Sequence, residues 1–206
     1  FPLMTQREIF LKHIAQTSGA PLGLEIVKAQ GTILQDVSGK EYIDLIGGIS
    51  VANIGHRHPK VVAAIKNQLD AYLHVMVYGE FIQTPQVRYA KLLTDHLPRT
   101  LNSVYFTNSG AEATEGAMKL AKRFTNRTNI VAFNNGYHGS TQGALSAIGN
   151  EYWRNAFRPL LPNICHVDFN ASQAISSIDE STACVLIETV QGEAGIIVPS
   201  AGWMLD

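Results

Sequence analysis

Residues 107–113 (TNSGAEA) form the first of three segments whose residue types could do chemistry. Ser109, Gly110 and Ala111 are small, so their backbone N–H groups can approach an anion closely. If a helix begins here, these groups have no partner within it, and the helix dipole attracts negative charge. The segment therefore predicts a phosphate site. The alternative is that its polar side chains only cap the helix, with Glu112 completing a capping box.

Residues 135–141 (NGYHGST) place an aromatic ring and an imidazole in a glycine-flanked loop. Tyr137 can stack on a planar cofactor, and the alternative is a loop anchor that packs on the surface. His138 is a candidate general base, although single histidines are more often structural. No second histidine stands at ligand spacing from it, so no metal site is expected.

Residues 183–195 (ACVLIETVQGEAG) combine an apolar run with two carboxylates, Glu188 and Glu193. Side chains at the carboxyl end of a parallel strand face the crevice in which α/β proteins bind ligands. The segment therefore predicts part of a binding site. The alternative is that both glutamates are solvated loop residues.

Strands and helices alternate around these three segments, which predicts an α/β fold with a mostly parallel sheet covered by helices. The predicted strands are 104–107, 130–133, 164–168 and 183–188, and the predicted helices are 110–124, a short one near 144, and 171–178.

The helix predicted from residue 110 to 124 has an apolar side that we expect to pack in the core. Its apolar residues are Ala113, Ala117, Leu120, Ala121 and Phe124. On its polar side, Glu115 and Lys119 are spaced for an ion pair along the helix.

The first part of the chain has a different pattern. Residues 24–46 alternate short β-like runs with turns, which predicts a small antiparallel meander. From Pro59, apolar residues recur at spacings of three and four as far as Met76, which predicts an amphipathic helix. A second helix is predicted to follow Pro85 and to be closed by Pro98.

Composition narrows the function classes. Hydrophobic residues make up 46% and charged residues 16% of 206 residues, which favours a folded chain over a disordered one. The net charge of −1 offers no basic excess for nucleic acid. No apolar stretch is long enough for a membrane span. Cys165 and Cys184 are predicted to be buried reduced thiols, which fits the cytoplasm, and no export leader is recognised.

Taken together, the motifs resemble the class III aminotransferases, the ornithine, acetylornithine and 4-aminobutyrate aminotransferase group of the fold type I enzymes that use pyridoxal 5′-phosphate (PLP). The resemblance runs from about Gly31 to Trp203. Several motifs in one order are far more specific than any one alone. They are 42–49 (YIDLIGGI), 55–59 (GHRHP), 108–113 (NSGAEA), 137–139 (YHG) and 190–195 (VQGEAG).

The resemblance implies a fold and a cofactor site. Residues 1–58 would form an N-terminal segment with the β meander, and residues 59–206 the first half of the PLP-binding large domain, without its C-terminal half. PLP would be bound at its phosphate by Ser109, Gly110 and Ala111, chiefly through backbone N–H groups. Further cofactor-binding residues would be Tyr137, stacked on the pyridine ring, with His138 and Glu188 nearby.

The resemblance also implies substrate contacts and a partner subunit. Glu188 and Glu193 would border the substrate pocket, and Glu193 resembles the family glutamate that pairs with a carboxylate-binding arginine. Ile49 would line the entrance. The family's site forms between two subunits, so the chain is expected to form a homodimer, with residues 78–84 serving the neighbouring subunit's site.

Two parts of the family's catalytic apparatus are not matched. Family members continue into an Asp-Glu-x-Gln-x-Gly segment, whose aspartate pairs with the pyridine nitrogen, and later reach the Schiff-base lysine. The eight lysines of this sequence lie outside that context, so no catalytic residue is assigned. Because the chemistry needs both groups, the chain by itself is expected to be inactive.

Ser140 stands where ornithine- and acetylornithine-type members often have an arginine for the substrate carboxylate. A serine cannot form that bidentate ion pair. The substitution therefore favours another ω-amino compound as donor.

The resulting hypothesis is a PLP-dependent aminotransferase that moves an amino group from an ω-amino acid or related amine to a 2-oxo acid. One alternative is a same-fold enzyme with another reaction, an aminomutase or a decarboxylase. The other is a non-catalytic, truncated cofactor-domain protein with a role in binding or assembly.

Overall fold

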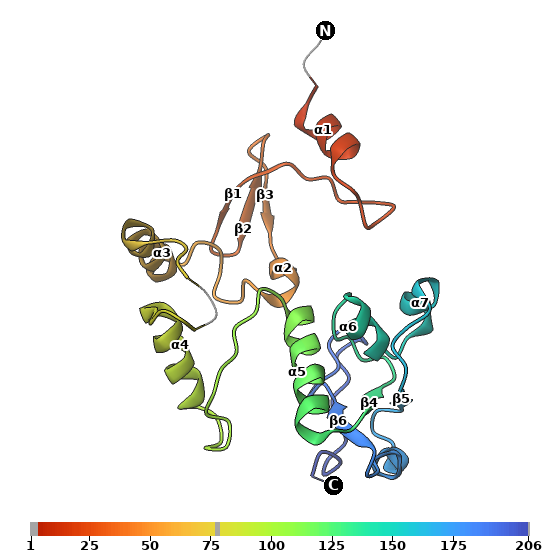
Figure 1. The fold of residues 1–206 in the computed structure, drawn as a ribbon. Coiled ribbons are helices and arrows are strands. Elements are labelled where there is room, and N and C mark those ends of the chain that lie inside the picture. The colour runs from red at the N-terminus through yellow and green to blue at the C-terminus, as the bar shows by residue number, and fades with distance from the viewer. Residues whose placement is uncertain (1–3, 77–78, 206) are drawn as a thin grey trace. The chain divides into compact units, whose positions relative to one another are not determined.

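The computed structural model describes residues 4–76 and 79–205, which divide into two compact units. Unit 1 comprises residues 1–87 and unit 2 residues 88–206, and their elements are labelled in Figure 1. The expected boundary after residue 58 is that of a large domain of which this chain would hold only the first half. The two units do not test it, and it stays a prediction.

Unit 1 begins with α1 (Gln6–His13), which the sequence analysis did not predict. Its capping box is complete: the Thr5 hydroxyl accepts from the Glu8 N–H at 3.2 Å, and the Glu8 carboxylate accepts from the Thr5 N–H at 2.7 Å. The Arg7 guanidinium donates to the Gly23 carbonyl at 2.9 Å, which ties the helix to the chain before the first strand.

The antiparallel meander is confirmed. It consists of β1 (Ile26–Gln30), β2 (Ile33–Asp36) and β3 (Glu41–Ile43), in the order β1-β2-β3. The turn between β2 and β3 is built around the Asp36 carboxylate. It accepts from the Ser38 N–H at 2.9 Å, the Lys40 N–H at 3.0 Å and the Tyr42 hydroxyl at 2.8 Å. The Ser38 hydroxyl also donates to it at 2.7 Å and contributes most to a pKa of Asp36 lowered to about 2, because all these bonds favour the charged form.

The β2–β3 turn should therefore lose stability in acid. Because folding lowers the pKa of Asp36, its contribution is fully present above the unfolded pKa, near 4, and is lost as the pH falls toward 2. We expect Asp36→Asn to weaken the turn at pH 6 and to flatten its pH dependence between pH 4 and 2. Amide NMR signals of residues 36–42 measure both effects, with Asp70→Asn in the exposed part of α3 (Pro59–Ala71) as control. Equal pH profiles for the wild type and Asp36→Asn would contradict this account.

Residues 44–56 form a closed segment held by an aspartate–histidine pair. The Asp44 carboxylate lies 2.6 Å from His56 Nε2 and also accepts from the Gly47 N–H at 2.9 Å. It thereby anchors α2 (Gly47–Ser50), in which all four residues have φ between 56° and 63°. This is a left-handed turn, which is costly for a β-branched residue such as Ile49. The sequence pattern did not predict it.

Both predicted helices of this region exist but end early. The first, α3, ends at Ala71 instead of reaching Met76, because Tyr72 is extended and its carbonyl accepts from the Gln68 side chain. The second, α4 (Thr84–Thr94), ends before Pro98, because the chain tightens into turns in which the Leu97 N–H bonds to the Thr94 carbonyl. Apolar spacing continues past both ends, so it does not fix where the backbone turns.

Unit 2 is built on a parallel sheet, as predicted. Its strands are β4 (Asn129–Phe133), β5 (Ile164–Val167) and β6 (Thr182–Leu186), with β4 paired to both neighbours. The long helix α5 (Gly110–Thr125) packs on β6 and on the short helix α6 (Gln142–Ala147), as Figure 1 shows. Met118 of α5, Ile130 and Ala132 of β4, and Ala147 of α6 form the core. The remaining elements are α7 (Glu151–Arg154), η1 (Asn155–Phe157) and η2 (Ser172–Ser177).

Two predicted elements of this unit are corrected. Residues 104–107 form no strand, because they pair with no other strand among the described residues. The helix expected over 171–178 is a 3-10 helix, with i to i+3 bonds such as that from the Ala174 N–H to the Ala171 carbonyl. Its sequence is rich in serine, which competes with α-helical backbone bonding.

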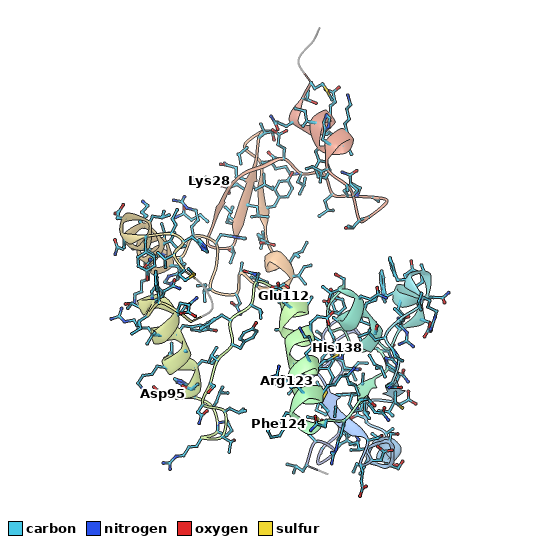
Figure 2. The ribbon with its side chains drawn as sticks, viewed as in Figure 1. Lys28, Asp95, Glu112, Arg123, Phe124 and His138 are labelled. Carbon is cyan, nitrogen blue, oxygen red and sulfur yellow. The ribbon has the colours of Figure 1, made fainter. Side chains whose placement is uncertain are left out.

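The expected packing of α5 is also corrected. The helix contacts the core through the side that carries Met118, so Leu120 is 67% and Phe124 86% exposed. Figure 2 shows Phe124 near the C-terminal end of α5. Ala113 and Ala117 are exposed as well, and of the predicted apolar side only Ala121 is partly buried. Apolar residues lie on two sides of α5, and their spacing does not show which side packs.

The cysteines are free, but they are not both buried. Cys184 is half-buried in β6, and burial raises the pKa of its thiol. Cys165 is exposed in β5, one of the two edge strands of the three-stranded sheet. No helix among the described residues is long and apolar enough to cross a membrane.

Candidate cofactor site

The first predicted segment forms the N-terminus of α5. Ser109 is the N-cap, and its hydroxyl accepts from the Glu112 N–H at 3.1 Å. The Glu112 carboxylate accepts from the Asn108 N–H at 2.7 Å, one residue before the N-cap, so Ser109 caps the helix as expected but the reciprocal bond of a capping box does not form. The N–H groups of Gly110 and Ala111 donate to no described residue and stay available to an anion. Capping and anion binding are therefore compatible at this helix end.

The second segment packs directly on this helix end. Gly139 has φ +122°, and a Cβ added there would lie 2.7 Å from the Ala111 Cβ. Beside this contact, the Thr114 hydroxyl of α5 donates to the His138 carbonyl at 3.0 Å. Figure 2 shows His138 beside α5. The two predicted motifs thus meet, and glycine is required at the point of closest approach.

The third segment joins them through Glu188. Its carboxylate accepts from the Tyr137 N–H at 3.1 Å. A Cβ added to Gly136 would lie 3.1 Å from His138 Nε2 and 3.6 Å from the same Glu188 carboxylate. The loop after β4 is therefore held between α5 on one side and the end of β6 on the other.

Gln191 is a site-supporting residue that the sequence analysis missed. Its side chain is 1% exposed and donates to the Asn134 carbonyl at 2.8 Å, just after β4. Its backbone exchanges two bonds of 3.0 Å with Ile197, which close the loop after β6. Only its place within the VQGEAG segment could have indicated it, because a glutamine has no apolar pattern to mark burial.

The electrostatics of the site favour a neutral imidazole. Burial lowers the pKa of His138, and the negative charge of Glu188 opposes this shift. His138 Nε2 is buried without a hydrogen-bond partner among the described residues. Tyr137 is 48% exposed, so its ring is accessible to a planar ligand.

The remaining predicted residues lie outside this cluster or are not placed relative to it. Ser140 is exposed and follows the Gly139 contact. Glu193 is exposed in the loop after β6 and forms no ion pair among the described residues. Ile49 belongs to unit 1, which is described separately. Tyr78, at the start of the expected intersubunit loop, is outside the described residues.

These donors and surfaces suit a phosphorylated, planar ligand. Two open N–H groups lie at a helix N-terminus, a glycine allows close approach, and an aromatic ring is half-exposed in the adjacent loop. This arrangement is typical of α/β proteins that bind anionic ring cofactors at the carboxyl ends of parallel strands.

The chain belongs to the class III aminotransferase family, whose family model matches residues 14–206. It is 42% identical over 205 residues to an acetylornithine aminotransferase of Methanopyrus kandleri, covering 98% of this chain and 51% of the relative. A Bacillus cereus acetylornithine aminotransferase is 41% identical, with 90% of this chain and 47% of the relative covered. The chain thus spans about half the length of the curated relatives it matches.

Solved structures confirm the fold type I prediction. An adenosylmethionine-8-amino-7-oxononanoate aminotransferase from Methanocaldococcus jannaschii matches with a TM-score of 0.89 at 29% identity, covering 96% of this chain and 50% of that one. A taurine:2-oxoglutarate aminotransferase from Bifidobacterium kashiwanohense, in complex with PLP and glutamate, matches with a TM-score of 0.84 at 28% identity. The match covers 100% of this chain and 52% of that one. The expected cofactor, PLP, is thereby confirmed at the level of the family.

Proposed function

We propose that this chain supplies the phosphate-binding and ring-binding half of the site of a PLP-dependent aminotransferase. The observation that carries the proposal is the convergence of Ala111, Tyr137 and Glu188. Gly139 fits against Ala111, and the Glu188 carboxylate holds the Tyr137 backbone. Three separate segments, two of which are joined by a bond between residues 51 positions apart, thus form one cluster with properties that suit the cofactor.

Each residue has a binding or orienting role in this proposal. Gly110 and Ala111 hold the phosphate through their N–H groups, together with Ser109 at the helix cap. Tyr137 stacks on the pyridine ring, and Glu188 fixes the position of Tyr137 through its backbone. His138 presents a neutral imidazole beside them. Bound PLP supplies the electron sink that amino-group transfer needs.

We propose that the amino donor is a compound with a terminal amine, and two observations bear on which one. The relatives favour acetylornithine, a carboxylate-bearing donor with a terminal amine. Ser140 favours an ω-amino compound whose carboxylate is not bound at this position, because a hydroxyl cannot replace a guanidinium. The acceptor is a 2-oxo acid such as 2-oxoglutarate.

Further parts of the proposal follow from family membership. We place the protein in the cytoplasm as a homodimer with a shared site. Ile49 lines the substrate entrance, Glu193 borders the substrate pocket, and residues 78–84 serve the neighbouring subunit. No described lysine lies in the cluster: Lys119 and Lys122 belong to the C-terminal half of α5 and border a surface hollow with Arg127. We propose that the lysine needed for catalysis is not among the eight of this chain.

Absorbance and intact mass of the purified protein, given PLP and then borohydride, test the proposal. We expect the 22.5 kDa chain to bind PLP reversibly, with visible absorbance that inorganic phosphate competes away and no gain of mass after reduction. A longer protein containing the missing lysine should gain the mass of the cofactor. If neither preparation binds PLP, the proposal is wrong, and a non-catalytic assembly role becomes the better hypothesis. If PLP is fixed but no amino group is transferred, an aminomutase or decarboxylase is favoured.

A further inference from the structure

The Glu115 carboxylate of α5 makes three hydrogen bonds to a different helix. One of its oxygens accepts from the Thr141 hydroxyl at 2.7 Å, from the Gly143 N–H at 2.8 Å and from the Ala144 N–H at 3.2 Å. The ion pair expected between Glu115 and Lys119 does not form among the described residues, because the carboxylate points to α6 instead.

Glu115 takes over the cap of α6. Thr141 occupies the N-cap position, but its side chain accepts no bond from α6 and donates to Glu115. The first N–H groups of a helix need an acceptor, and a negative charge there also interacts favourably with the helix dipole. Hydrogen bonds to a charged acceptor are about twice as strong as neutral ones.

Gly143 leaves the space that this carboxylate occupies. A Cβ added to Gly143 would lie 2.2 Å from one Glu115 oxygen and 2.7 Å from the other. Gly143 is buried at the start of α6, so a methyl group there would have to displace the carboxylate. The observed position of the Glu115 carboxylate therefore requires a glycine at residue 143.

The neighbouring residues Thr114 and Glu115 both bond to the loop that carries Tyr137 and His138. Thr114 binds the His138 carbonyl at 3.0 Å, and Glu115 binds Thr141 three residues later. Between these two points, Gly139 contacts Ala111 in the first turn of α5. The same helix thus presents the open N–H groups and fixes the loop that faces them.

We propose that Glu115 is a positioning residue that sets the Tyr137–Ser140 loop against the phosphate-binding turn of α5. It acts through Thr141, Gly143 and Ala144 and does not touch the ligand. The inference rests on the proposed function, because the geometry that it fixes is that of a PLP site.

The first test compares PLP binding by the wild type, Glu115→Ala and Glu115→Gln in the full chain. Glu115→Ala should raise the Kd for PLP about tenfold, on the order of the loss of one charged hydrogen bond, and should change the visible circular dichroism of bound PLP. Glu115→Gln keeps an acceptor and should recover part of both signals. A purely structural role would lower Tm and leave the Kd and the visible spectrum unchanged where all variants are folded.

The second test uses the dependence between residues 115 and 143. Gly143→Ala alone should weaken PLP binding as much as Glu115→Ala, because its methyl group displaces the carboxylate. In the Glu115→Ala background, Gly143→Ala should add little, because the space is already free. Gly116→Ala is the matched control: a Cβ there meets only Tyr105 Cε1, at 3.8 Å, and should leave PLP binding unchanged.

The outcomes separate the two proposals. A wild type that binds no PLP overturns the proposed function, and the inference with it. A wild type that binds PLP, with Glu115→Ala unchanged in Kd and visible spectrum, overturns the inference alone. Strictly additive effects of Glu115→Ala and Gly143→Ala would also overturn it.

Discussion

Gly139→Ala is expected to weaken PLP binding at least about tenfold and to destabilise unit 2 by about 2–4 kcal/mol. The new methyl group would lie 2.7 Å from the Ala111 Cβ, 2.8 Å from its Cα and 3.2 Å from the Ala144 Cβ. The backbone adds a second cost, because a φ of +122° is adopted readily only by glycine. Neither neighbour has a flexible side chain that can move aside.

The loss of binding follows from where relaxation must occur. To relieve the contact, the loop must move away from the first turn of α5, which separates Tyr137 from the N–H group of Ala111. Urea unfolding followed by tryptophan fluorescence gives the stability of unit 2, because Trp153 and Trp203 both lie in it. Titration with PLP gives the affinity. Gly116→Ala is the control, and wild-type behaviour of Gly139→Ala would show that the close contact is wrong.

Ile130→Ala is expected to destabilise unit 2 by about 2–5 kcal/mol, the range for truncating a fully buried aliphatic side chain. Ile130 is 0% exposed and lies in β4, the central strand. The surrounding cluster includes Met118 and Ala147, so the cavity borders two helices as well as the sheet. The sheet and the two helices pack against one another through this cluster, so they cannot move together to fill the cavity.

Chemical denaturation measures this prediction, with Ile175→Ala as a matched control. Ile175 carries the same side chain in the same unit but is 53% exposed in η2, so its truncation should cost well under half as much. Equal losses for the two variants would contradict the assignment of the core.

The meeting of Tyr137 and Glu188 could be predicted from sequence, because each follows a strand of the parallel sheet. Ser109–Ala111 form the start of a predicted helix, Tyr137 follows β4, and Glu188 follows β6. Parallel strands deliver Tyr137 and Glu188 to the same edge of the sheet, whereas Ser109–Ala111 follow no strand and meet them through the packing of α5 on the loop after β4. The resemblance to class III aminotransferases added the cofactor and the role of each residue.

Contacts between distant segments left no comparable signal. Glu115 has the spacing of an ordinary surface ion pair with Lys119, yet its partners lie 26 to 29 residues away. Leu120 and Phe124 have the spacing of a core face, yet they are exposed, because α5 packs through another side. Strand 104–107 has the composition of a strand but lacks a pairing partner among the described residues. All three features depend on which surfaces of the chain pack together, and the spacing of residue types along the sequence does not specify this.

The bond between Glu188 and the Tyr137 N–H joins residues 51 positions apart, and that between Gln191 and Asn134 joins residues 57 apart. Such contacts are of high sequence separation, and their loop-closure entropy must be overcome before they form. We therefore expect the loop geometry around Tyr137 to form only when β6 docks on β4. On the proposed function, a phosphorylated ligand should bind only the completed unit, so its presence during refolding should stabilise the end state without accelerating the early steps.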